Sequence, residues 1–414
     1  MTPVRFDDVR MRGFGARAAV ADVLVLLDAR IVALASEEVP LLDTAGRVLA
    51  EPIASAVDVP GFARSAMDGF AVRAAGTAGA SDVAPVALVL VGTALPARPF
   101  AGEVGAGEAV RVTTGAPVPA GADAVLMAEF AHLESETRVL ARAAVAPRKH
   151  VVRVGEDVAK GREVLHKGRV LRPQDVGLLA SVGAATVRAV RRPRVAILVT
   201  GNELLPPGRA PVGFRIVDSN SPMLAALAAR DGATVLPVRY VPDDYAAVRD
   251  AIREAALVAD VVLVSGGTSV GTEDHGPRAA AELGELAVHG VALRPAGPMG
   301  VAFLPVPAFL VPGNPVACLC AYDLFAGRAV RKLGGRAWEL PYRRATLPLA
   351  FAVESVAGRV DYVRVKIEGG AAVPLATGGA SNLSSAVVAD GFVLVPVDRA
   401  ALAPGEPVEV WLYE

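Results

Sequence analysis

The chain has 414 residues, of which 53% are hydrophobic and 21% are charged. At roughly 150 residues per domain this length predicts about three domains, and the composition excludes a disordered chain. The 42 basic and 43 acidic residues give a formal net charge of -1. This balance removes the global electrostatic case for nucleic acid or an anionic membrane as the main partner.

The N-terminus, MTPVRFDDVRMRG, lacks the apolar core of a signal peptide, and no uncharged apolar run approaches the roughly 20 residues that span a bilayer. The only two cysteines, Cys318 and Cys320, exclude a disulfide framework. They are two apart in a predicted helix and so face different sides, which makes them poor joint metal ligands. We interpret them as buried small hydrophobic residues and expect a soluble, cytoplasmic protein.

The first half of the chain changes pattern twice. Residues 16–60 are predicted to form helix, turn and helix, followed by an extended segment. From Gly61 to about Val154, short β-type runs broken by Gly, Pro and Ala predict a small β-rich domain. Helical signals return over 155–190, where LRPQDVGLLASVG has Pro near its start and Gly at its end. The β-rich domain is therefore predicted to be inserted into an elongated helical domain.

The stretch from Arg192 to about Gly335 has the pattern of a doubly wound α/β sheet. The runs VAILVT (195–200) and DVVLVS (260–265) are typical of strands buried on both faces of a parallel sheet. Between them we predict a helix with Ser221 as N-cap, a strand over Ala233–Val241 and a helix starting at Asp243. Ligands bind such sheets beyond the carboxyl ends of the strands.

The last 70 or so residues return to short β-type runs, such as RVDYVRVKI and GFVLVPV, and predict a β-barrel or sandwich. The expected fold class is thus a multidomain α/β protein with a central doubly wound domain. Its expected divisions are a helical domain (1–60 and 155–191), an inserted β-rich domain (61–154), the α/β domain (192–338) and a C-terminal β-barrel (339–414).

Glycine stands beside Ser, Thr or Asn in four loops that directly follow β-type runs. They are VTTGAPVPAGADAV (112–125), VTGNELLPPG (199–208), SGGTSVGTEDHG (265–276) and VPGNPVA (311–317). Glycine allows close approach to a ligand, and successive N–H groups can hold an anion. One such loop is equally well explained by turn geometry, but three in one α/β domain favour a phosphate-bearing ligand. Neither a P-loop nor a dinucleotide-binding motif is present, which excludes an ordinary P-loop hydrolase and a nicotinamide dehydrogenase.

Acidic residues lie in or beside loops at six positions: Asp68, Asp157, Glu203, Asp218, Asp243 and Asp274. Carboxylate oxygens suit Mg²⁺, which keeps several waters and bridges substrate phosphates. Asp243 is also explained as a helix N-cap and Asp157 as a turn residue, whereas Glu203 and Asp274 lie inside glycine-bearing strand-end loops. Anion-holding loops combined with carboxylates indicate a metal-assisted reaction at a phosphate.

Taken in order, SAMDGFAV, TTGAPVPAGADAV, GEDV, LVTGNELLPPG, IVDSN, SGGTSVG and VPGNPV resemble the molybdopterin molybdenumtransferase family, of MoeA type, to which the E domain of gephyrin also belongs. The resemblance implies a four-domain elongated homodimer with an active site between domains. It implies insertion of molybdate into adenylylated molybdopterin, with release of AMP and Mg²⁺ assistance. It also suggests a molybdopterin adenylyltransferase and apo-molybdoenzymes as partners, and leaves open whether molybdate or tungstate is used.

Site residues follow from the resemblance, position by position. The functionally important group is expected to comprise Asp68, Asp157, Thr114, Glu203, Asp243 and Asp274, the last three also as Mg²⁺ ligands. Loops 265–271 and 312–315 would hold the pterin phosphate and the oxyanion. Substrate contacts are expected from Arg215, Asp218, Asn220, Gly266, Gly267, Ser269, Arg294, Pro298, Pro312, Gly313, Asn314 and Pro315.

The chain departs from the family pattern at two places. A KPGKP-like segment is RPAGP (294–298) here, so Arg294 replaces one lysine and Gly297 stands at the position of the other. The residue after PGNPV is Ala317 where Ser is frequent. Both changes remove oxyanion contacts, for which Arg294 and Arg215 are the candidate replacements. They motivate an alternative hypothesis, a molybdopterin-binding carrier without the chemistry. A third, molybdopterin adenylyltransferase, is disfavoured because the extra domains also match the insertase.

Overall fold

A computed structural model gives the structure of the chain, and it describes residues 14–269, 271, 273–375 and 379–413. The N-terminal segment used above to exclude a signal peptide, residues 1–13, lies outside these residues. The chain divides into two compact units. Unit 1 comprises residues 1–37, 46–48 and 189–414, and unit 2 comprises residues 38–45 and 49–188. Within the described residues, no helix is both long and apolar enough to cross a membrane.

Unit 1 is built on a mostly parallel sheet. Its strand order is β16 (Thr234–Val235), β13 (Arg194–Thr200), β18 (Val261–Ser265), β22 (Pro307–Val311), β21 (Gly300–Phe303) and β19 (Glu285–His289), and β17 (Arg239–Val241) also pairs with β13. The strands from β16 to β22 run parallel, while β21 and β19 are antiparallel additions at one edge. The predicted doubly wound sheet is confirmed.

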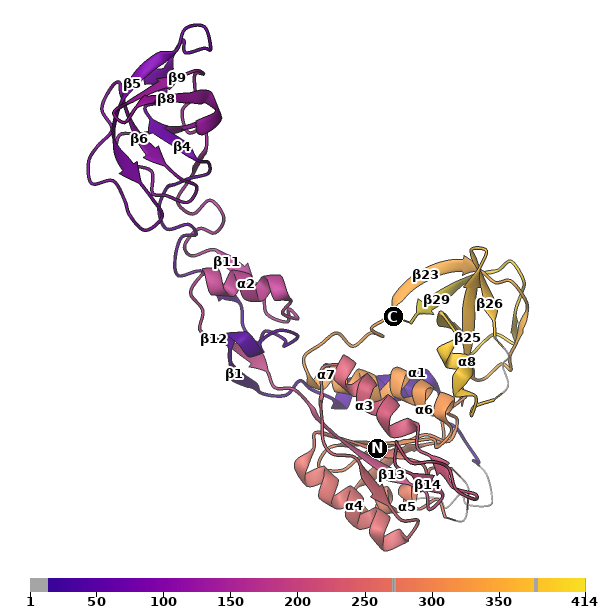
Figure 1. Cartoon of the computed structure of the whole chain (residues 1–414). Coiled ribbons are helices and arrows are strands. Elements are labelled where there is room, and N and C mark those ends of the chain that lie inside the picture. Colours follow the sequence, from indigo (N-terminus) through magenta and orange to yellow (C-terminus); the bar gives the residue numbers. More distant parts are fainter. Residues whose placement is uncertain (1–13, 270, 272, 376–378, 414) are drawn as a thin grey trace. The chain divides into compact units, whose positions relative to one another are not determined.

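Helices cover both faces of this sheet (Figure 1). One face carries α1 (Val20–Arg30), α3 (Asn220–Arg230), α6 (Pro315–Ala321) and α7 (Gly327–Leu333), and the other carries α4 (Tyr245–Val258) and α5 (Gly276–Leu283). Strand β13 explains the two layers, because alternate residues point to opposite faces. Val195, Ile197 and Val199 pack in the first core, whereas Ala196 and Leu198 pack in the second.

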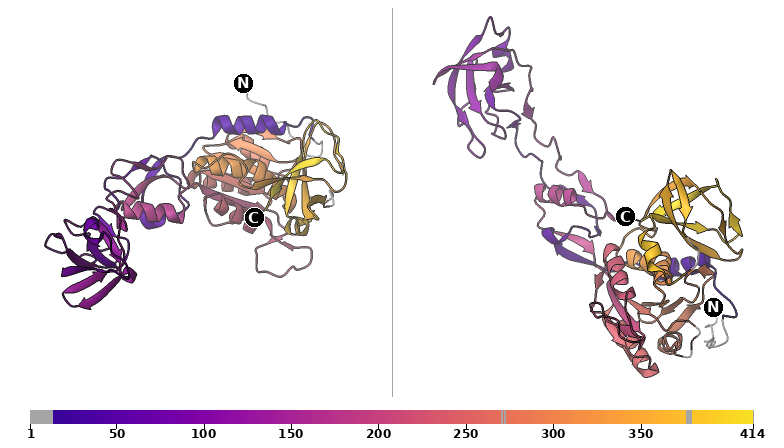
Figure 2. Two further views of the ribbon diagram at one scale, coloured as in Figure 1. Left: turned by 90° about the horizontal axis from the view of Figure 1, so that it is seen from above. Right: turned by 45° about the vertical axis from the view of Figure 1, so that its right-hand side comes forward.

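The helix α6 continues through a π-helical turn, Tyr322–Ala326 (η4), into α7. Cys318 and Cys320 are buried free thiols on α6, as interpreted from the sequence, and burial raises the pKa of both. Figure 2 shows α1 (indigo) beside this helix (orange) in both turned views. The prediction of a second helix within 16–60 is wrong: the chain there forms β1 (Ser36–Pro40), because the segment SEEVP ends in Pro40 and has no helical apolar stripe.

The C-terminal residues of unit 1 form a sheet of order β20 (Leu293–Arg294), β25 (Val360–Glu368), β27 (Gly391–Val395), β29 (Pro407–Leu412) and β23 (Arg343–Pro348). Strand β26 (Ala371–Pro374) also pairs with β25, and a small ribbon joins β24 (Val353–Glu354) to β28 (Ala401–Leu402). A short helix, α8 (Leu383–Val387), precedes β27. Strand β20 belongs by sequence to the α/β region, so the two parts share one sheet.

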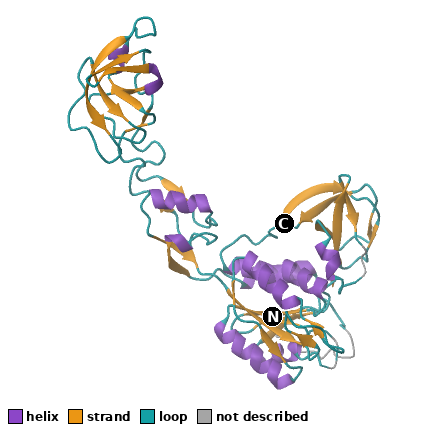
Figure 3. Cartoon of the chain, in the orientation of Figure 1, coloured by secondary structure: helices purple, strands orange, loops and turns teal. Residues whose placement is uncertain are grey.

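Unit 2 contains a sheet of order β7 (Ala124–Met127), β4 (Gly69–Val72), β6 (Glu108–Val112), β5 (Val86–Ala94), β9 (Arg138–Ala141) and β8 (Ala131–Ser135). Figure 3 shows this part as strands and loops with only short helical turns. The rest of unit 2 has the helix α2 (Pro173–Ser181) and short ribbons formed by β2 (Ile53–Ala54) with β11 (Glu163–Leu165) and by β3 (Arg64–Ser65) with β10 (Val151–Val152). Strand β12 (Thr186–Val190) pairs with β1. The four domain boundaries stay a prediction.

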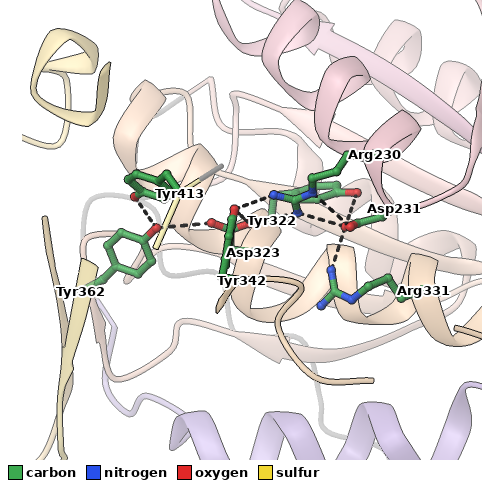
Figure 4. A network of polar contacts seen from close by, with 8 residues as sticks. All are labelled: Arg230, Asp231, Tyr322, Asp323, Arg331, Tyr342, Tyr362 and Tyr413. Carbon is green, nitrogen blue, oxygen red and sulfur yellow. Dashed lines mark hydrogen bonds and ion pairs between the residues drawn. The ribbon is translucent and has the colours of Figure 1, made fainter. Parts of the chain in front are cut away.

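A buried polar network joins the helical layer of unit 1 to its C-terminal sheet (Figure 4). Asp231, after α3, accepts hydrogen bonds from Arg331 (2.7 Å) and Tyr322 (3.1 Å). Asp323, on η4, accepts from Tyr342 (2.8 Å) and Tyr362 (3.3 Å). The remaining members of this network are Arg230, which bonds both aspartates, and Tyr413. Both aspartates are fully buried, so each depends on these partners.

Removing one partner from the buried polar network should destabilise unit 1. Asp231→Ala leaves Arg331 buried without its counter-ion, so we expect a loss of about 3–5 kcal/mol in the free energy of unfolding. Tyr362→Phe removes the hydrogen bonds of one hydroxyl, to Asp323 (3.3 Å) and with the Tyr413 hydroxyl (2.6 Å), but no charge, and should cost about 1–2 kcal/mol. Both tryptophans, Trp338 and Trp411, lie in unit 1, so urea unfolding followed by tryptophan fluorescence reports on it. Equal losses in the two variants would contradict a charge-compensation role.

In unit 2, Asp175 lies in the first turn of α2 and should make the stability of the fold depend on pH. Its side chain accepts hydrogen bonds from Arg169 (2.8 and 2.9 Å) and from the Arg172 N–H (2.9 Å). The hydrogen bond from Arg169 lowers the pKa of Asp175 well below its usual range, despite burial. A lowered pKa stabilises the fold above the unfolded value of about 3.9, and this stabilisation is lost as the pH falls towards the folded value.

We therefore expect Asp175→Asn to cost about 1.5–3 kcal/mol at pH 7. The gap between wild type and variant should be largest above about pH 5 and should narrow below about pH 4. Scanning calorimetry of the full chain at several pH values measures this gap. Glu136→Gln, at an exposed hairpin turn, is the matched control. A gap that stays constant from pH 7 to pH 3 would show that the charge of Asp175 does not contribute.

Candidate active site

Two glycine-bearing loops lie side by side at the carboxyl ends of β18 and β22. The Gly266 N–H donates to the Val311 carbonyl (3.2 Å). The Asn220 amide, at the start of α3, donates to the Ser265 hydroxyl (3.0 Å) and to the Gly313 carbonyl (2.8 Å). Asn220 thus ties both loops to the first turn of a helix. The strand-end placement expected from the sequence puts these residues on one edge of the sheet.

The loop after β18 turns tightly because two successive glycines adopt positive φ, +90° at Gly266 and +60° at Gly267. A Cβ at Gly266 would lie 2.6 Å from the Thr200 carbonyl oxygen, so no larger residue fits. His289 also contacts this loop, since its Nε2 lies 3.2 Å from the Thr268 carbonyl oxygen. The loop is held from several sides; Val270 within it lies outside the described residues.

Asn220 also presents a polar atom that lacks a partner. The residue is 5% exposed, and its Oδ1 has no hydrogen-bond partner among the residues that the structure describes. A buried carbonyl oxygen in this condition costs free energy unless a donor reaches it. Because Asn220 stands between the two glycine-bearing loops, Oδ1 is a ready acceptor for an N–H or O–H of a bound ligand.

Asp218, two residues before Asn220, is buried, and its carboxylate is already hydrogen-bonded to groups of the protein. Its carboxylate accepts hydrogen bonds from the N–H groups of Asn220 (2.9 Å) and Ser221 (3.1 Å), and from the hydroxyls of Ser221 and Tyr240 (2.9 Å for Tyr240). Burial raises the pKa of Tyr240. These bonds fix the first turn of α3, which starts at Asn220 rather than at the predicted Ser221 N-cap. Asp218 therefore positions Asn220.

The loops after β13 and β17 bring two of the predicted acids near each other. Asp243 accepts from the Asn202 N–H (2.9 Å), and the Asn202 side chain lies 3.3 Å from the Asp243 nitrogen. Glu203 is the next residue. The N-cap of α4 is Asp244, which accepts from the Ala247 N–H, so the prediction that this helix starts at Asp243 is wrong by two residues. Asp243 is thereby free of the capping role.

Asp274 lies further along the loop after β18, where its carboxylate accepts from the Gly271 N–H (2.5 Å). Among the described residues, no group of three or more His, Cys, Asp and Glu side chains is arranged to hold a metal ion. A closed, all-protein metal site is therefore not present in that part of the chain. Mg²⁺ in phosphate chemistry takes one or two carboxylates and completes its shell with water and substrate oxygens. The exposed Glu203 and half-buried Asp243 suit such an open site.

A cavity of about 310 Å³ adjoins the loop after β22. It gathers Arg294, Pro298, Pro312 and Asn314 of the predicted site, together with the departing residues Gly297 and Ala317. Three further arginines line it, none of which the sequence analysis had named: Arg17, Arg359 and Arg364. No Asp or Glu is among the described residues that line it. The cavity is therefore cationic and suits a small anion.

The C-terminal part of unit 1 closes this cavity. The Val316 N–H donates to the Ala380 carbonyl (2.9 Å), and Ser381 donates to Asn314 Oδ1 (2.9 Å). Arg359 and Arg364 belong to or flank β25. Their sequence neighbourhood is an ordinary alternating strand, so only the pairing of β20 with β25 reveals that they face the RPAGP segment. Sequence reasoning had no local signal for them.

The other predicted residues fall in two places. In unit 1, Ser269 lies in the loop after β18, Pro315 begins α6, and the exposed Arg215 donates to the Leu204 carbonyl (3.3 Å). In unit 2, Thr114 donates to the exposed Asp68 through its N–H (2.7 Å) and hydroxyl (3.1 Å). Asp157 lies in a turn of unit 2 outside the sheet that contains β4 and β6, and its N–H donates to the Val59 carbonyl (3.0 Å).

A doubly wound sheet with glycine-bearing strand-end loops and an arginine-lined cavity is the arrangement expected of a protein that binds a phosphate-bearing substrate. Family models match the chain over three ranges: the MoeA N-terminal region (domain I and II) over residues 16–183, a probable molybdopterin binding domain over 196–332, and the MoeA C-terminal region (domain IV) over 346–413. These ranges cover most of the chain in order.

Whole-chain similarity gives the same result. A molybdopterin molybdenumtransferase of Haemophilus influenzae is 32% identical over 91% of this chain and 93% of its own length. A putative molybdopterin biosynthesis protein of Methanocaldococcus jannaschii is 34% identical over 91% and 92%. The solved MoeA protein of Pyrococcus horikoshii is 33% identical, covers 96% of this chain and 100% of its own, and has a TM-score of 0.81. The chain belongs to the molybdopterin molybdenumtransferase family, the transferases of molybdenum cofactor biosynthesis. The predicted family and fold class are confirmed.

The tight loop after β18 should not accept a side chain at Gly266. Gly266→Ala combines a positive φ with a clash against Thr200, so we expect unit 1 to lose about 3 kcal/mol or more in its free energy of unfolding. Gly208→Ala is the matched control, because Gly208 also has positive φ (+87°) but nothing within 4 Å of its Cβ position. It should lose only about 1–2 kcal/mol. Urea unfolding followed by tryptophan fluorescence separates the two; equal losses would contradict the clash.

Proposed function

We propose that this protein is a molybdenum insertase, which inserts molybdate into adenylylated molybdopterin and releases AMP with the assistance of Mg²⁺. The observation that carries this proposal is the adjacency of the paired loops after β18 and β22 to the arginine-lined cavity, because Pro312 and Asn314 of the loop after β22 also line the cavity. One half suits a phosphate and its attached ring system, and the other suits a small oxyanion. Proximity of two reactants is itself a large source of rate.

The predicted residues divide between these tasks. The Gly267 N–H would hold the pterin phosphate, and Gly266, whose own N–H bonds the Val311 carbonyl, would give the loop its tight turn. Ser269, Pro312, Gly313 and Pro315 would shape the same edge. Asn220 Oδ1 would accept a hydrogen bond from the pterin, and Asp218 would hold Asn220 in place. Arg294, Pro298 and Asn314 would form the oxyanion side. Arg215, exposed beside the Glu203 loop, would meet negative charge on the substrate.

The acidic residues would assist cleavage of the phosphoanhydride bond. Glu203, Asp243 and Asp274 would hold Mg²⁺ together with the substrate phosphates, where the ion would neutralise charge that develops on the phosphate oxygens. In unit 2, Asp68 with Thr114, and Asp157, complete the proposed set. A homodimer with two-chain active sites, a cytoplasmic location, and a molybdopterin adenylyltransferase and apo-molybdoenzymes as partners belong to this proposal. Molybdate is the oxyanion of this proposal, and tungstate is the alternative that the assay below compares with it.

One alternative has an observation in its favour. Gly297 and Ala317, which lack the side chains frequent in the family, both line the cavity. A protein that had lost oxyanion affinity would bind the pterin and act as a carrier. AMP release separates the two hypotheses: the insertase releases AMP from adenylylated molybdopterin in the presence of molybdate or tungstate, and the carrier does not.

Glu203→Ala tests the proposed reaction. We expect AMP release and reconstitution of a cofactor-free molybdoenzyme to fall by about 10²–10³-fold, because one preorganised charged group at a reacting phosphate is typically worth this much. Glu254→Ala, on the exposed side of α4, is the matched control and should keep wild-type rates. The purified proteins are assayed with Mg²⁺ and with either oxyanion. A Glu203→Ala variant that keeps most of its activity would remove Glu203 from the mechanism.

A further inference from the structure

Gly297 leaves a space in the wall of the arginine-lined cavity, and a side chain from elsewhere in the chain occupies it. A Cβ at position 297 would lie 3.6 Å from a terminal nitrogen of Arg17 and 3.7 Å from its guanidinium carbon. Arg17 itself lines the cavity. The cationic head of Arg17 thus lies in van der Waals contact with the point where a side chain at 297 would begin.

The backbone fixes this placement. Ala18 forms an isolated parallel bridge with Val291, in which its N–H donates to the Gly290 carbonyl (3.0 Å) and its carbonyl accepts from Ala292 (2.8 Å). The Val291 N–H in turn donates to the Gly297 carbonyl (2.8 Å). Arg17 is therefore held beside the turn that ends at Gly297 by three consecutive backbone hydrogen bonds.

Packing in front of Arg17 supports the same position. Phe14 lies against Gly290, where a Cβ would approach its ring to 2.6 Å, and makes an edge contact with His289 (centroids 5.0 Å apart). The Arg17 guanidinium carbon lies 5.6 Å from the centre of the Phe14 ring. Such a cation–π contact restrains the guanidinium without neutralising it.

The charge balance of the cavity leaves Arg17 available for an anion. Asp361, behind the cavity wall, accepts hydrogen bonds from Arg359 (2.7 and 3.3 Å) and lies 3.7 Å from Arg294. One carboxylate thus serves two arginines. Arg17 makes no ion pair with any residue that the structure describes. Among the described residues that line this cavity there are four arginines and no carboxylate.

We propose that Arg17 supplies the cation that Gly297 lacks, and that it binds the tetrahedral dianion together with Arg294. This inference rests on the proposed function, which assigns the oxyanion to this cavity. A guanidinium presents two parallel N–H donors that match two oxygens of an oxyanion. With arginine in place of lysine, the anion is therefore bound through two hydrogen bonds of fixed direction and not by a single compact charge. Ala317 then removes one hydrogen-bond donor from a site that keeps its charge.

The test measures binding of sodium molybdate alone to the full-length protein by titration calorimetry. Arg17→Ala should raise the dissociation constant for molybdate by about 10- to 100-fold, because a hydrogen bond to a charged group typically contributes this much to binding. Arg17→Lys should fall between this variant and wild type. Arg253→Ala, at an exposed arginine of α4, is the control and should bind like wild type. Unfolding midpoints without molybdate show that each variant is folded.

A second variant separates charge supply from a structural effect. Gly297→Lys in the Arg17→Ala background restores a cation from the other side of the same gap. The double variant should bind molybdate at least tenfold more tightly than Arg17→Ala alone. A loss in Arg17→Ala that Gly297→Lys does not restore would overturn the proposal, because Arg17 would then act on the shape of the cavity.

Arg294→Ala distinguishes failure of this inference from failure of the proposed function on which the inference rests. If Arg294→Ala abolishes molybdate binding and Arg17→Ala leaves it unchanged, the cavity holds the oxyanion but Arg17 does not contribute. If molybdate binds and neither substitution changes its affinity, the oxyanion site lies elsewhere and both assignments fail.

Discussion

The arrangement of the site depends on two buried aspartates. Asp231 and Asp323 are the acceptors of the buried polar network, and their donors come from the helical layer and from the C-terminal sheet of unit 1. Burial raises the pKa of Asp323, and the nearby Arg230 opposes this rise. Charges removed from water in this way are costly unless every donor is in place, so the network tolerates few relative positions of the two parts.

This constraint reaches the cavity through a single helix. The chain from Pro315 to Leu333 is helical throughout, through α6, η4 and α7. It begins next to Asn314, at the cavity, and carries Asp323 two turns later. Across the cavity stand Arg359 and Arg364, on the sheet that supplies Tyr362 to Asp323. The same contacts that seat the C-terminal sheet on the helices therefore fix the distance between the two walls of the cavity.

The sequence was sufficient for features carried by a local pattern. VAILVT and DVVLVS are β13 and β18, and the glycine-bearing loops follow strands as expected. Local signals failed where two neighbouring residues suit the same role: Asp243 and Asp244 are both plausible N-caps, and only the structure shows that Asp244 caps α4. The predicted strand over Ala233–Val241 is divided into β16 and β17, because Pro237 cannot donate a ladder hydrogen bond between them. The sequence did not identify Arg17, Arg359 and Arg364 as site residues, because each reaches the cavity through backbone pairing with a segment distant in sequence.

The composition explains how the cavity stays cationic without lysine. The chain has very few lysines, and none lines the cavity among the described residues. A lysine at 297 would place a mobile ammonium on a flexible stem, whereas the arginines around this cavity are each tied down by a backbone bridge, a carboxylate or a strand position. A fixed guanidinium loses less conformational entropy when an anion binds, so preorganisation offsets part of what a missing hydrogen-bond donor at Ala317 removes. The departures from the family pattern at Gly297 and Ala317 therefore do not contradict the proposed oxyanion site, because the cavity around them is lined by arginines where the family pattern has lysine.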